Sequence, residues 1–226
     1  MIQAITTPKL SQEALARILD VTQKLAEPYD LLHMLTEVVD AGESVLAADK
    51  AALWLYDPAR DDLIMKVPTF KPAPRMVAGE GLVGECISTR EIINVPNAYA
   101  DSRFSKAVDM ATGYKTQSVL NVPLLGLEKQ PVGVLQLLNK NTGVFDESDE
   151  LLASTLAAQC AVAVQRMQLT EALILKERLD EEVSLAREVQ MSTLPTEMPK
   201  VAGYDLQGHF VPTGHAGGDL FDLQFD

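Results

Sequence analysis

Residues 144–194 contain neither glycine nor proline. Because these two residues most readily end a helix, and because the run is rich in Ala, Leu, Glu, Gln and Arg, the sequence predicts one long helix. At about 1.5 Å per residue, that helix would reach about 60–70 Å if unbroken. A domain of this size is shorter than that, so we expect the helix to extend beyond it.

The two halves of this run differ in pattern. The first half is apolar enough to pack on a sheet, through Leu151, Leu152, Leu156, Ala157, Cys160 and Val164. The second half carries a stripe whose steps alternate between three and four residues, which is the coiled-coil period. Its members are Val162, Gln165, Leu169, Ala172, Lys176, Leu179, Val183 and Ala186. We expect a parallel homodimer through residues 162–190; the alternative is a single helix packed on its own domain.

The residues before this helix predict helices and strands in a mixed order. Helices are expected at 9–26, ended by Pro28, and from Leu31 to Val45 after an Asp30 cap. Strands are expected at 51–56, 63–67, 92–95, 119–125 and 132–138, with a hairpin at 126–131. An irregular loop is expected at 68–80, and short helices at 85–89 and 104–110. This order predicts an α+β domain whose antiparallel sheet is covered by helices.

Composition excludes several classes of function. Nineteen Lys and Arg against 32 Asp and Glu give a net charge of −13. Such an acidic chain lacks the electrostatic footprint of a nucleic-acid or anionic-membrane binder. Cys86 and Cys160 are too few for a disulfide framework and too far apart for a zinc site. No secretory signal or membrane-spanning run is present, so we expect a cytoplasmic protein.

The stretch 139–150 reads as a strand end, a turn and the first turn of the long helix. Ser148 or Asp146 is a candidate cap for that helix. Lys140 lies across the turn from Asp149, and an ion pair between them would attach the strand to the helix. Gly79, Gly81 and Gly84 mark a strand-to-helix turn, which suits either an anion site or plain tight packing.

Residues 30–168 resemble a GAF domain, the small-molecule sensor module of phosphodiesterases, adenylyl cyclases and bacterial signalling proteins. Asn139-Lys140, Phe145 and Asp149-Glu150 match the spacing of the signature found in its cyclic-nucleotide-binding members. A second stretch agrees with the region that forms the lid over the nucleotide. It comprises Asp101-Ser102-Arg103-Phe104, Asp109, Thr112-Gly113-Tyr114, Thr116 and Pro123.

The resemblance implies that cAMP or cGMP is the ligand. It implies that Asp109, Thr112 and Thr116 approach the base and cyclic phosphate, together with the backbone at Leu82 and Val83. The residues implied to support the pocket from outside are Asn139, Lys140, Phe145, Asp149 and Glu150. Three places depart from the family pattern: Ala52 replaces a polar phosphate contact, Gln136 replaces an acid, and Phe70 is the nearest aromatic to the base-stacking place. A different small ligand, or none, is the alternative.

The tail carries a second resemblance, to the opening of SpoIIE-like serine phosphatases of the PPM family. The matching residues are Leu185-Ala186-Arg187-Glu188-Val189-Gln190, Leu194-Pro195, Pro199, Gly203-Tyr204-Asp205, Pro212 and Gly217-Gly218-Asp219-Leu220-Phe221-Asp222. The resemblance implies a Mn²⁺ or Mg²⁺ centre in the complete domain, with Asp219 as a ligand and Asp222 as a helper. The alternative is a Gly-Gly turn followed by two surface acids. Because one or two carboxylates do not hold a two-metal site, we expect no bound metal and no phosphatase activity in this chain.

Four segments follow from these patterns: an N-terminal helix (1–29), a sensor domain (30–168), a helical linker (169–194) and the truncated start of a phosphatase domain (195–226). We expect the sensor to bind a cyclic nucleotide and to signal through a dimeric linker to the phosphatase. The resemblance implies an anti-sigma-factor antagonist as the phosphoprotein substrate. The alternative is a ligand-independent module that only pairs phosphatase domains.

Overall fold

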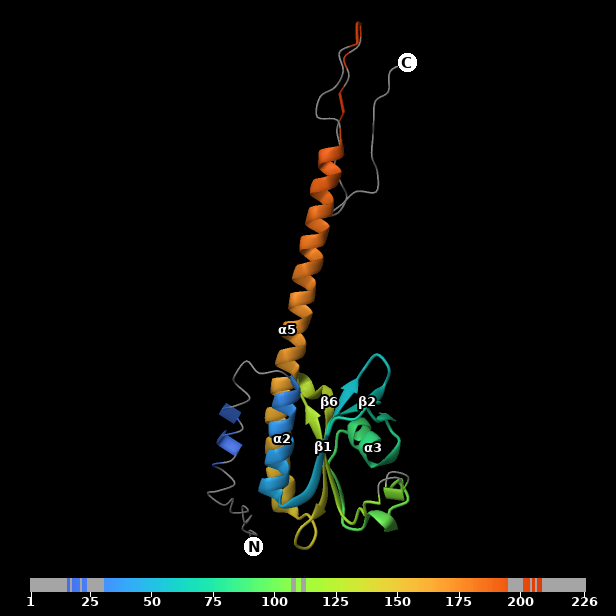
Figure 1. Cartoon of the computed structure of the whole chain (residues 1–226), viewed down its shortest axis with the longest axis vertical. Helices are drawn as coiled ribbons and strands as arrows, with labels where there is room; N and C mark the ends of the chain where they lie inside the picture. The colour runs from blue at the N-terminus through green and yellow to red at the C-terminus, as the bar shows by residue number, and fades with distance from the viewer. Residues whose placement is uncertain are drawn as a thin grey trace, which may run out of the picture. The chain divides into compact units, whose positions relative to one another are not determined.

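The computed structural model describes residues 16, 18–20, 22–23, 31–106, 109–110, 113–194, 201–203, 205 and 207–208. The chain divides into two compact units, Met1–Met167 and Gln168–Asp226. The first unit is built on a six-stranded antiparallel sheet with the strand order β3-β2-β1-β6-β5-β4. Helices cover this sheet, which confirms the α+β class expected from the sequence (Figure 1).

The sheet is centred on its two longest strands. Its members are β1 (Ala48–Asp57), β2 (Asp62–Val67), β3 (Arg75–Val77), β4 (Ile93–Val95), β5 (Val119–Leu125) and β6 (Pro131–Lys140). Strand β6 pairs antiparallel with both β1 and β5, so residues far apart in sequence meet at the centre of the sheet. The β5–β6 connection is a hairpin with a 3₁₀ turn, η2 (Leu127–Lys129), as the sequence predicts.

Strand β3 is a correction to the expected loop at 68–80. It pairs with β2, placing Ile64 opposite Arg75. The Arg75 guanidinium also donates two hydrogen bonds, of 2.7 and 2.8 Å, to the Asp62 carboxylate, which keeps the pKa of that carboxyl below its usual range. Only three residues long and without a buried side chain, β3 carries no hydrophobic alternation from which to predict it.

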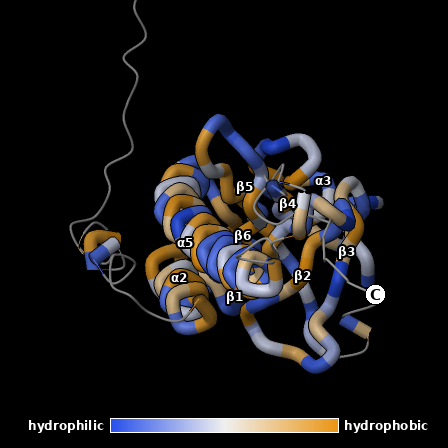
Figure 2. Tube along the Cα trace, turned by 90° about the horizontal axis from the view of Figure 1, so that it is seen from above, coloured by the Kyte–Doolittle hydropathy of each residue, from blue (hydrophilic) through white to orange (hydrophobic). Residues whose placement is uncertain are grey.

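Helices lie on both faces of the sheet. Helices α2 (Leu31–Leu46) and α5 (Glu147–Thr193) lie side by side on one face, and α3 (Gly81–Thr89) lies on the other (Figures 1 and 2). We call these the helix face and the α3 face. A second 3₁₀ turn, η1 (Ala98–Ala100), follows β4. Helix α3 begins four residues before its predicted start at Glu85. Of the helix predicted at 104–110, Asp109 and Met110 are helical, whereas the prediction is wrong for residues 104–106.

The helix face carries the larger core. Alternate residues of the central strands point to it, including Leu53 of β1, Leu120 of β5 and Leu135 of β6, each fully buried. Helix α2 adds Leu35 and Val38, which are also fully buried. Completely burying such side chains contributes about 1.5–3 kcal/mol each, so this layer dominates the stability of the fold.

The α3 face has a smaller apolar cluster. The intervening strand residues point to it, among them Trp54, Val119 and Val134, and α3 adds Val83 and Cys86. Burial raises the pKa of the Cys86 thiol to about 12, so the side chain is an unreactive apolar group at neutral pH. The same holds for Cys160 on the helix face, where burial also raises the thiol pKa to about 12.

Helix α5 confirms the long helix expected from the breaker-free run. Its side chains are buried at intervals from Asp149 to Val164, the part that packs on the sheet. The apolar residues beyond are exposed, among them Leu169 (55%) and Leu179 (51%). In the part of the chain that the structure describes, no helix combines the length and apolarity needed to cross a membrane.

Several sequence predictions lie outside the described residues. The helix expected at 9–26 is described only at residues 16, 18–20 and 22–23, which are helical. The Asp30 cap and Pro28 fall outside them.

Candidate functional site

The α3 face is where polar side chains interrupt the core. Ala52, Gln136 and Asn121 occupy one row across β1, β6 and β5, since Ala52 pairs with Gln136 and Gln136 pairs with Asn121. Side chains alternate along a strand, and Trp54 and Val134 mark this parity as the α3 face. The Trp54 indole N–H donates to Gln136 Oε1 at 3.3 Å. The row therefore combines a small methyl group with two amides.

The segment 109–118 is fastened by Asp109. This carboxylate is buried (4% exposed) and accepts three hydrogen bonds. They come from the Thr116 amide (2.7 Å), the Thr116 hydroxyl (2.8 Å) and the Tyr99 hydroxyl (3.1 Å). Burial, followed by the hydrogen bond to the Asp109 carboxylate, raises the pKa of the Tyr99 phenol. Asp109 and Thr116, both predicted ligand contacts, thus form a clasp that closes the segment on itself.

Asn139 fastens the end of the same segment to β6. Its Oδ1 accepts from the Gln117 amide (2.6 Å), and its Nδ2 donates to the Lys115 carbonyl (2.9 Å) and the Tyr114 hydroxyl (3.0 Å). The residue adopts φ +52°, which asparagine tolerates better than most residues. The Tyr114 hydroxyl donates to Asp49 at 2.7 Å, and burial together with this bond raises its pKa.

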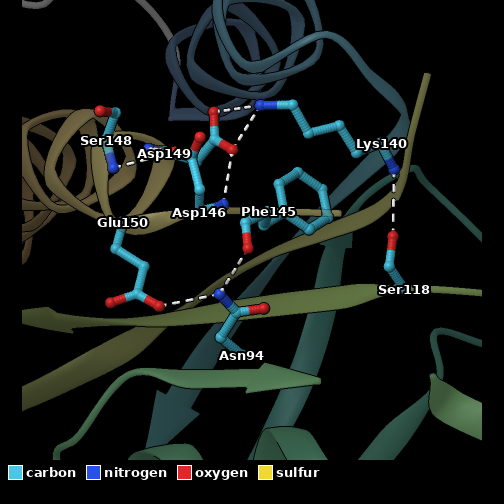
Figure 3. Close-up of polar contacts among 8 residues, drawn as sticks. All are labelled: Asn94, Ser118, Lys140, Phe145, Asp146, Ser148, Asp149 and Glu150. Atoms are coloured by element: carbon cyan, nitrogen blue, oxygen red, sulfur yellow. Dashed lines mark hydrogen bonds and ion pairs between the residues drawn. The ribbon is translucent and has the colours of Figure 1, made fainter. Parts of the chain in front are cut away.

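Lys140, the next residue, fastens β6 to α5. Its ammonium group pairs with both carboxylate oxygens of Asp149, which confirms the ion pair expected from the sequence (Figure 3). Both side chains are largely buried, at 16% and 7% exposure, so the pair lies in a region of low dielectric constant. Lys140 also stands 5.8 Å from the centre of the Phe145 ring. The backbone amide of Lys140 donates to the Ser118 hydroxyl at 3.2 Å.

The first turn of α5 completes the polar network. Asp146 is the helix cap, because its Oδ1 accepts from the amides of Ser148 (2.9 Å) and Asp149 (3.0 Å). These backbone bonds hold the pKa of Asp146 below its usual range. Glu150 accepts from Asn94 Nδ2 at 2.8 Å, and the same nitrogen donates to the Phe145 carbonyl at 3.0 Å (Figure 3). The motif therefore joins β6, β4 and α5.

The glycines of residues 79–84 serve close packing. A Cβ added to Gly84 would stand 2.4 Å from the Val77 carbonyl oxygen, so only glycine lets α3 approach β3 here. The Gly79 amide donates to the Gly84 carbonyl at 2.8 Å, which closes the turn. Of the two interpretations of this turn, its geometry favours tight packing.

The remaining predicted contacts are placed differently. Leu82 and Val83 lie buried in the first turn of α3, on the α3 face. Phe70 is half exposed (50%) in the loop between β2 and β3 and belongs to neither core cluster. Thr112 lies outside the described residues, as do the predicted metal ligands Asp219 and Asp222. Within the described ranges, no three His, Cys, Asp or Glu side chains gather as a metal site would require.

Asn121 is the polar residue of this face that the sequence did not single out. It is fully buried (0% exposed), and neither its Nδ2 nor its Oδ1 has a hydrogen-bond partner among the residues described. Nearly all buried polar atoms in proteins are paired. An asparagine between Leu120 and Val122 in an otherwise apolar strand was the available signal.

Comparisons with known proteins agree with this architecture. The model of the family described as "GAF domain" matches residues 30–164. Among solved structures, the GAF domain of an Acinetobacter phosphoenolpyruvate-protein phosphotransferase superposes with a TM-score of 0.60 at 24% identity, over 70% of this chain and 96% of that one. A free methionine-R-sulfoxide reductase from Neisseria meningitidis gives a TM-score of 0.57 at 18% identity, over 75% and 99%. At these identities, the two similarities show a shared fold.

Curated relatives include phosphodiesterases. A cGMP-specific 3',5'-cyclic phosphodiesterase of Drosophila virilis is 38% identical over 95 residues, which is 41% of this chain and 11% of that protein. A probable 3',5'-cyclic phosphodiesterase of Caenorhabditis elegans is 28% identical over 169 residues, 67% of this chain and 23% of that protein. The match therefore spans a quarter or less of these relatives' length.

Proposed function

Since this chain belongs to the GAF domain family, we propose that its first unit is a sensor that binds a cyclic nucleotide, cAMP or cGMP, on the α3 face. The observation that carries the proposal is the way the segment 109–118 is held. The Asp109 clasp and Asn139 fasten it, and Asn139 adjoins Lys140, which pairs with α5. A ligand that changes this segment would therefore act on residues attached to α5. The similarity to phosphodiesterases supports a cyclic nucleotide.

Calorimetric titration of the chain with cAMP and with cGMP tests this proposal. We expect saturable binding of at least one nucleotide with micromolar or tighter affinity. Thr116→Ala should weaken nucleotide binding at least tenfold, because the substitution removes a hydroxyl that holds the segment 109–118. Thr155→Ala is the matched control: its hydroxyl bonds the Leu151 carbonyl on the exposed side of α5, and binding should be unchanged. Absence of heat with both nucleotides, from folded protein free of copurified nucleotide, would reject the proposal.

We propose further that the exposed stripe of α5 forms a homodimer. From Leu169 to Val183 its steps alternate between three and four residues, and its large apolar members Leu169, Leu179 and Val183 are exposed; Lys176 is its one charged member in this range. Gln165, predicted as part of the seam, accepts a hydrogen bond from the Leu127 amide at 2.9 Å in the β5–β6 turn. A Cβ added to Gly126 would stand 2.6 Å from the same Gln165 oxygen. We therefore propose that the seam begins after Gln165, at Leu169.

Sedimentation velocity tests the dimer. Leu179→Asp places a charge in the seam and should give a monomer at concentrations where the parent chain is dimeric. Leu185→Asp is the control, because Leu185 is also exposed (62%, against 51% for Leu179) yet lies outside the stripe. If Leu179→Asp and the parent chain sediment alike, the proposed dimer interface on α5 is rejected.

The output that we propose for this sensor is a SpoIIE-like serine phosphatase. It rests on the motif order from Leu185 to Asp222 alone, most of which lies outside the described residues. In this scheme ligand binding changes the seam, and the phosphatase then acts on an anti-sigma-factor antagonist. Crosslinking between cysteines placed along the seam should report a different register with ligand than without it. An unchanged register would favour the second candidate, a ligand-independent dimerisation module. The observation behind that candidate is the exposure of Leu169, Leu179 and Val183 in the stripe.

A further inference from the structure

We infer that Asn121 is a specificity-determining residue of the proposed nucleotide site, reading the edge of the base. The inference rests on the proposed function, since it places Asn121 in the same site. Its starting point is the fully buried amide with two unpartnered polar atoms among the residues described. Leaving such groups unpaired costs about 1–3 kcal/mol. Asn94 Oδ1 is also buried without a partner, but among the described residues Asn121 alone has both amide atoms unpartnered. A fold that retains that cost has a use for the group.

The position of Asn121 in the sheet places it beside a second amide on the α3 face. Asn121 and Gln136 are directly paired across β5 and β6, so their Cβ atoms are about 4.5–5.5 Å apart on the same face. Gln136 in turn pairs with Ala52 of β1, whose methyl group is the smallest side chain in the row. A flat ring lying along this row from Ala52 would meet both amides.

The chemistry of the two amides suits a purine. The Trp54 indole N–H bonds Gln136 Oε1, so the Gln136 amide nitrogen is turned away from Trp54 and offers donors. Asn121 offers one donor group and one acceptor with no competing partner among the described residues. Purine edges carry adjacent donors and acceptors, and asparagine and glutamine amides pair with them in two-bond contacts. The cyclic phosphate carries no such donor, so this row is a base subsite.

Alternative explanations of the orphaned amide make different forecasts. A buried water would satisfy Asn121 without any ligand. In that case an apolar substitution would leave nucleotide binding as it is. A base contact instead forecasts that the apolar residue is tolerated by the unliganded fold while selectivity is lost, because discrimination by hydrogen bonds disappears with the group that makes them.

The test is Asn121→Val, which removes both polar atoms and introduces a β-branched side chain suited to a strand. We measure its thermal midpoint without ligand and its dissociation constants for cGMP and cAMP by calorimetry. We expect an unchanged or higher midpoint, at least tenfold weaker binding of the preferred nucleotide, and a cGMP:cAMP affinity ratio at least tenfold closer to one.

Asn94→Val is the matched control. Asn94 lies on the neighbouring strand β4 with the opposite parity, and its Nδ2 is already bonded to Phe145 and Glu150. It should lower the midpoint and leave the affinity ratio unchanged. If Asn121→Val binds both nucleotides like the parent chain, the inference is overturned while the proposed function stands. If the parent chain binds neither nucleotide, both are overturned.

Discussion

The two faces of the sheet bury different chemistry. Among the described residues, the cluster on the helix face holds 27 buried residues and that on the α3 face holds 12. The helix face joins the central strands to α2 and α5 through aliphatic side chains, whereas the α3 face includes a buried amide row and, beside it, a self-bonded carboxylate. One face thus supplies most of the stability, which leaves the other free to carry polar groups whose burial is costly.

The largest loss of stability is expected when the buried ion pair between Lys140 and Asp149 is broken. Asp149→Ala leaves the Lys140 ammonium buried without its partner, and the free energy of unfolding should fall by about 3–5 kcal/mol. Urea denaturation measures it. The double variant Lys140→Met with Asp149→Leu removes both charges and should recover most of the loss. A double variant as unstable as the single one would mean that the ion pair itself, rather than the orphaned charge, dominates.

Neighbouring residues of β6 sharpen the contrast between the faces. Leu135 points to the helix face and Val134 to the α3 face, and both are fully buried. Leu135→Ala should cost about 2–5 kcal/mol and leave nucleotide affinity intact in the folded fraction. Val134→Ala should cost about 1–3 kcal/mol and weaken binding, since it alters the floor beside Gln136. Denaturation and calorimetry on the two variants, side by side, would contradict the division of labour if Leu135→Ala alone lost binding.

A smaller effect is expected at the clasp. Asp109→Ala strands the Thr116 amide and hydroxyl, and should lower the free energy of unfolding by about 1–3 kcal/mol. The change is local, so hydrogen exchange should accelerate at the Thr116 amide and remain slow at Leu135. Equal acceleration at both amides would show that the clasp belongs to the global fold.

The smallest effect concerns the cap of α5. Asp146→Ala should cost about 1 kcal/mol at pH 7. Because the folded-state pKa of Asp146 is lowered, this contribution is complete above the unfolded pKa of about 4 and disappears as the pH falls through the folded value. Thermal unfolding of the variant and the parent should therefore converge at low pH. If the variant and the parent still differ in thermal midpoint at pH 2, the negative charge of Asp146 is not the source of the stabilisation.

The sequence predicted the elements with strong periodicity. The breaker-free run became α5 within three residues at its start and one at its end, and the apolar runs of β5 and β6 were correct to within two residues. Strand β3 was missed because its three residues bury no side chain. The start of α3 was placed late because its first turn contains two glycines, Gly81 and Gly84, which are poor helix formers; Gly84 is required there for the close approach to β3.

The candidate site was predicted in part. The spacing of Lys140 and Asp149 indicated their ion pair correctly, because the strand, turn and helix between them are local in sequence. The orphaned amide of Asn121 depends on what covers β5 and on its partner across the sheet, and neither is visible from neighbouring residues. Asp109 was expected to approach a ligand. In the structure its carboxylate accepts hydrogen bonds from Thr116 and Tyr99. The ligand contacts themselves remain predictions.

The adjacency of Asn139 and Lys140 has a consequence for protein engineering. Asn139 is bonded to the segment ending at Ser118, and Lys140 to α5, so two consecutive residues serve two different neighbours. An insertion or deletion of one residue before them would exchange their directions, whereas substitutions elsewhere on β6 leave the directions intact. A chimera that grafts this sensor onto another effector should therefore keep β6 through the cap at Asp146 as one block, and place its junction on α5 beyond Met167.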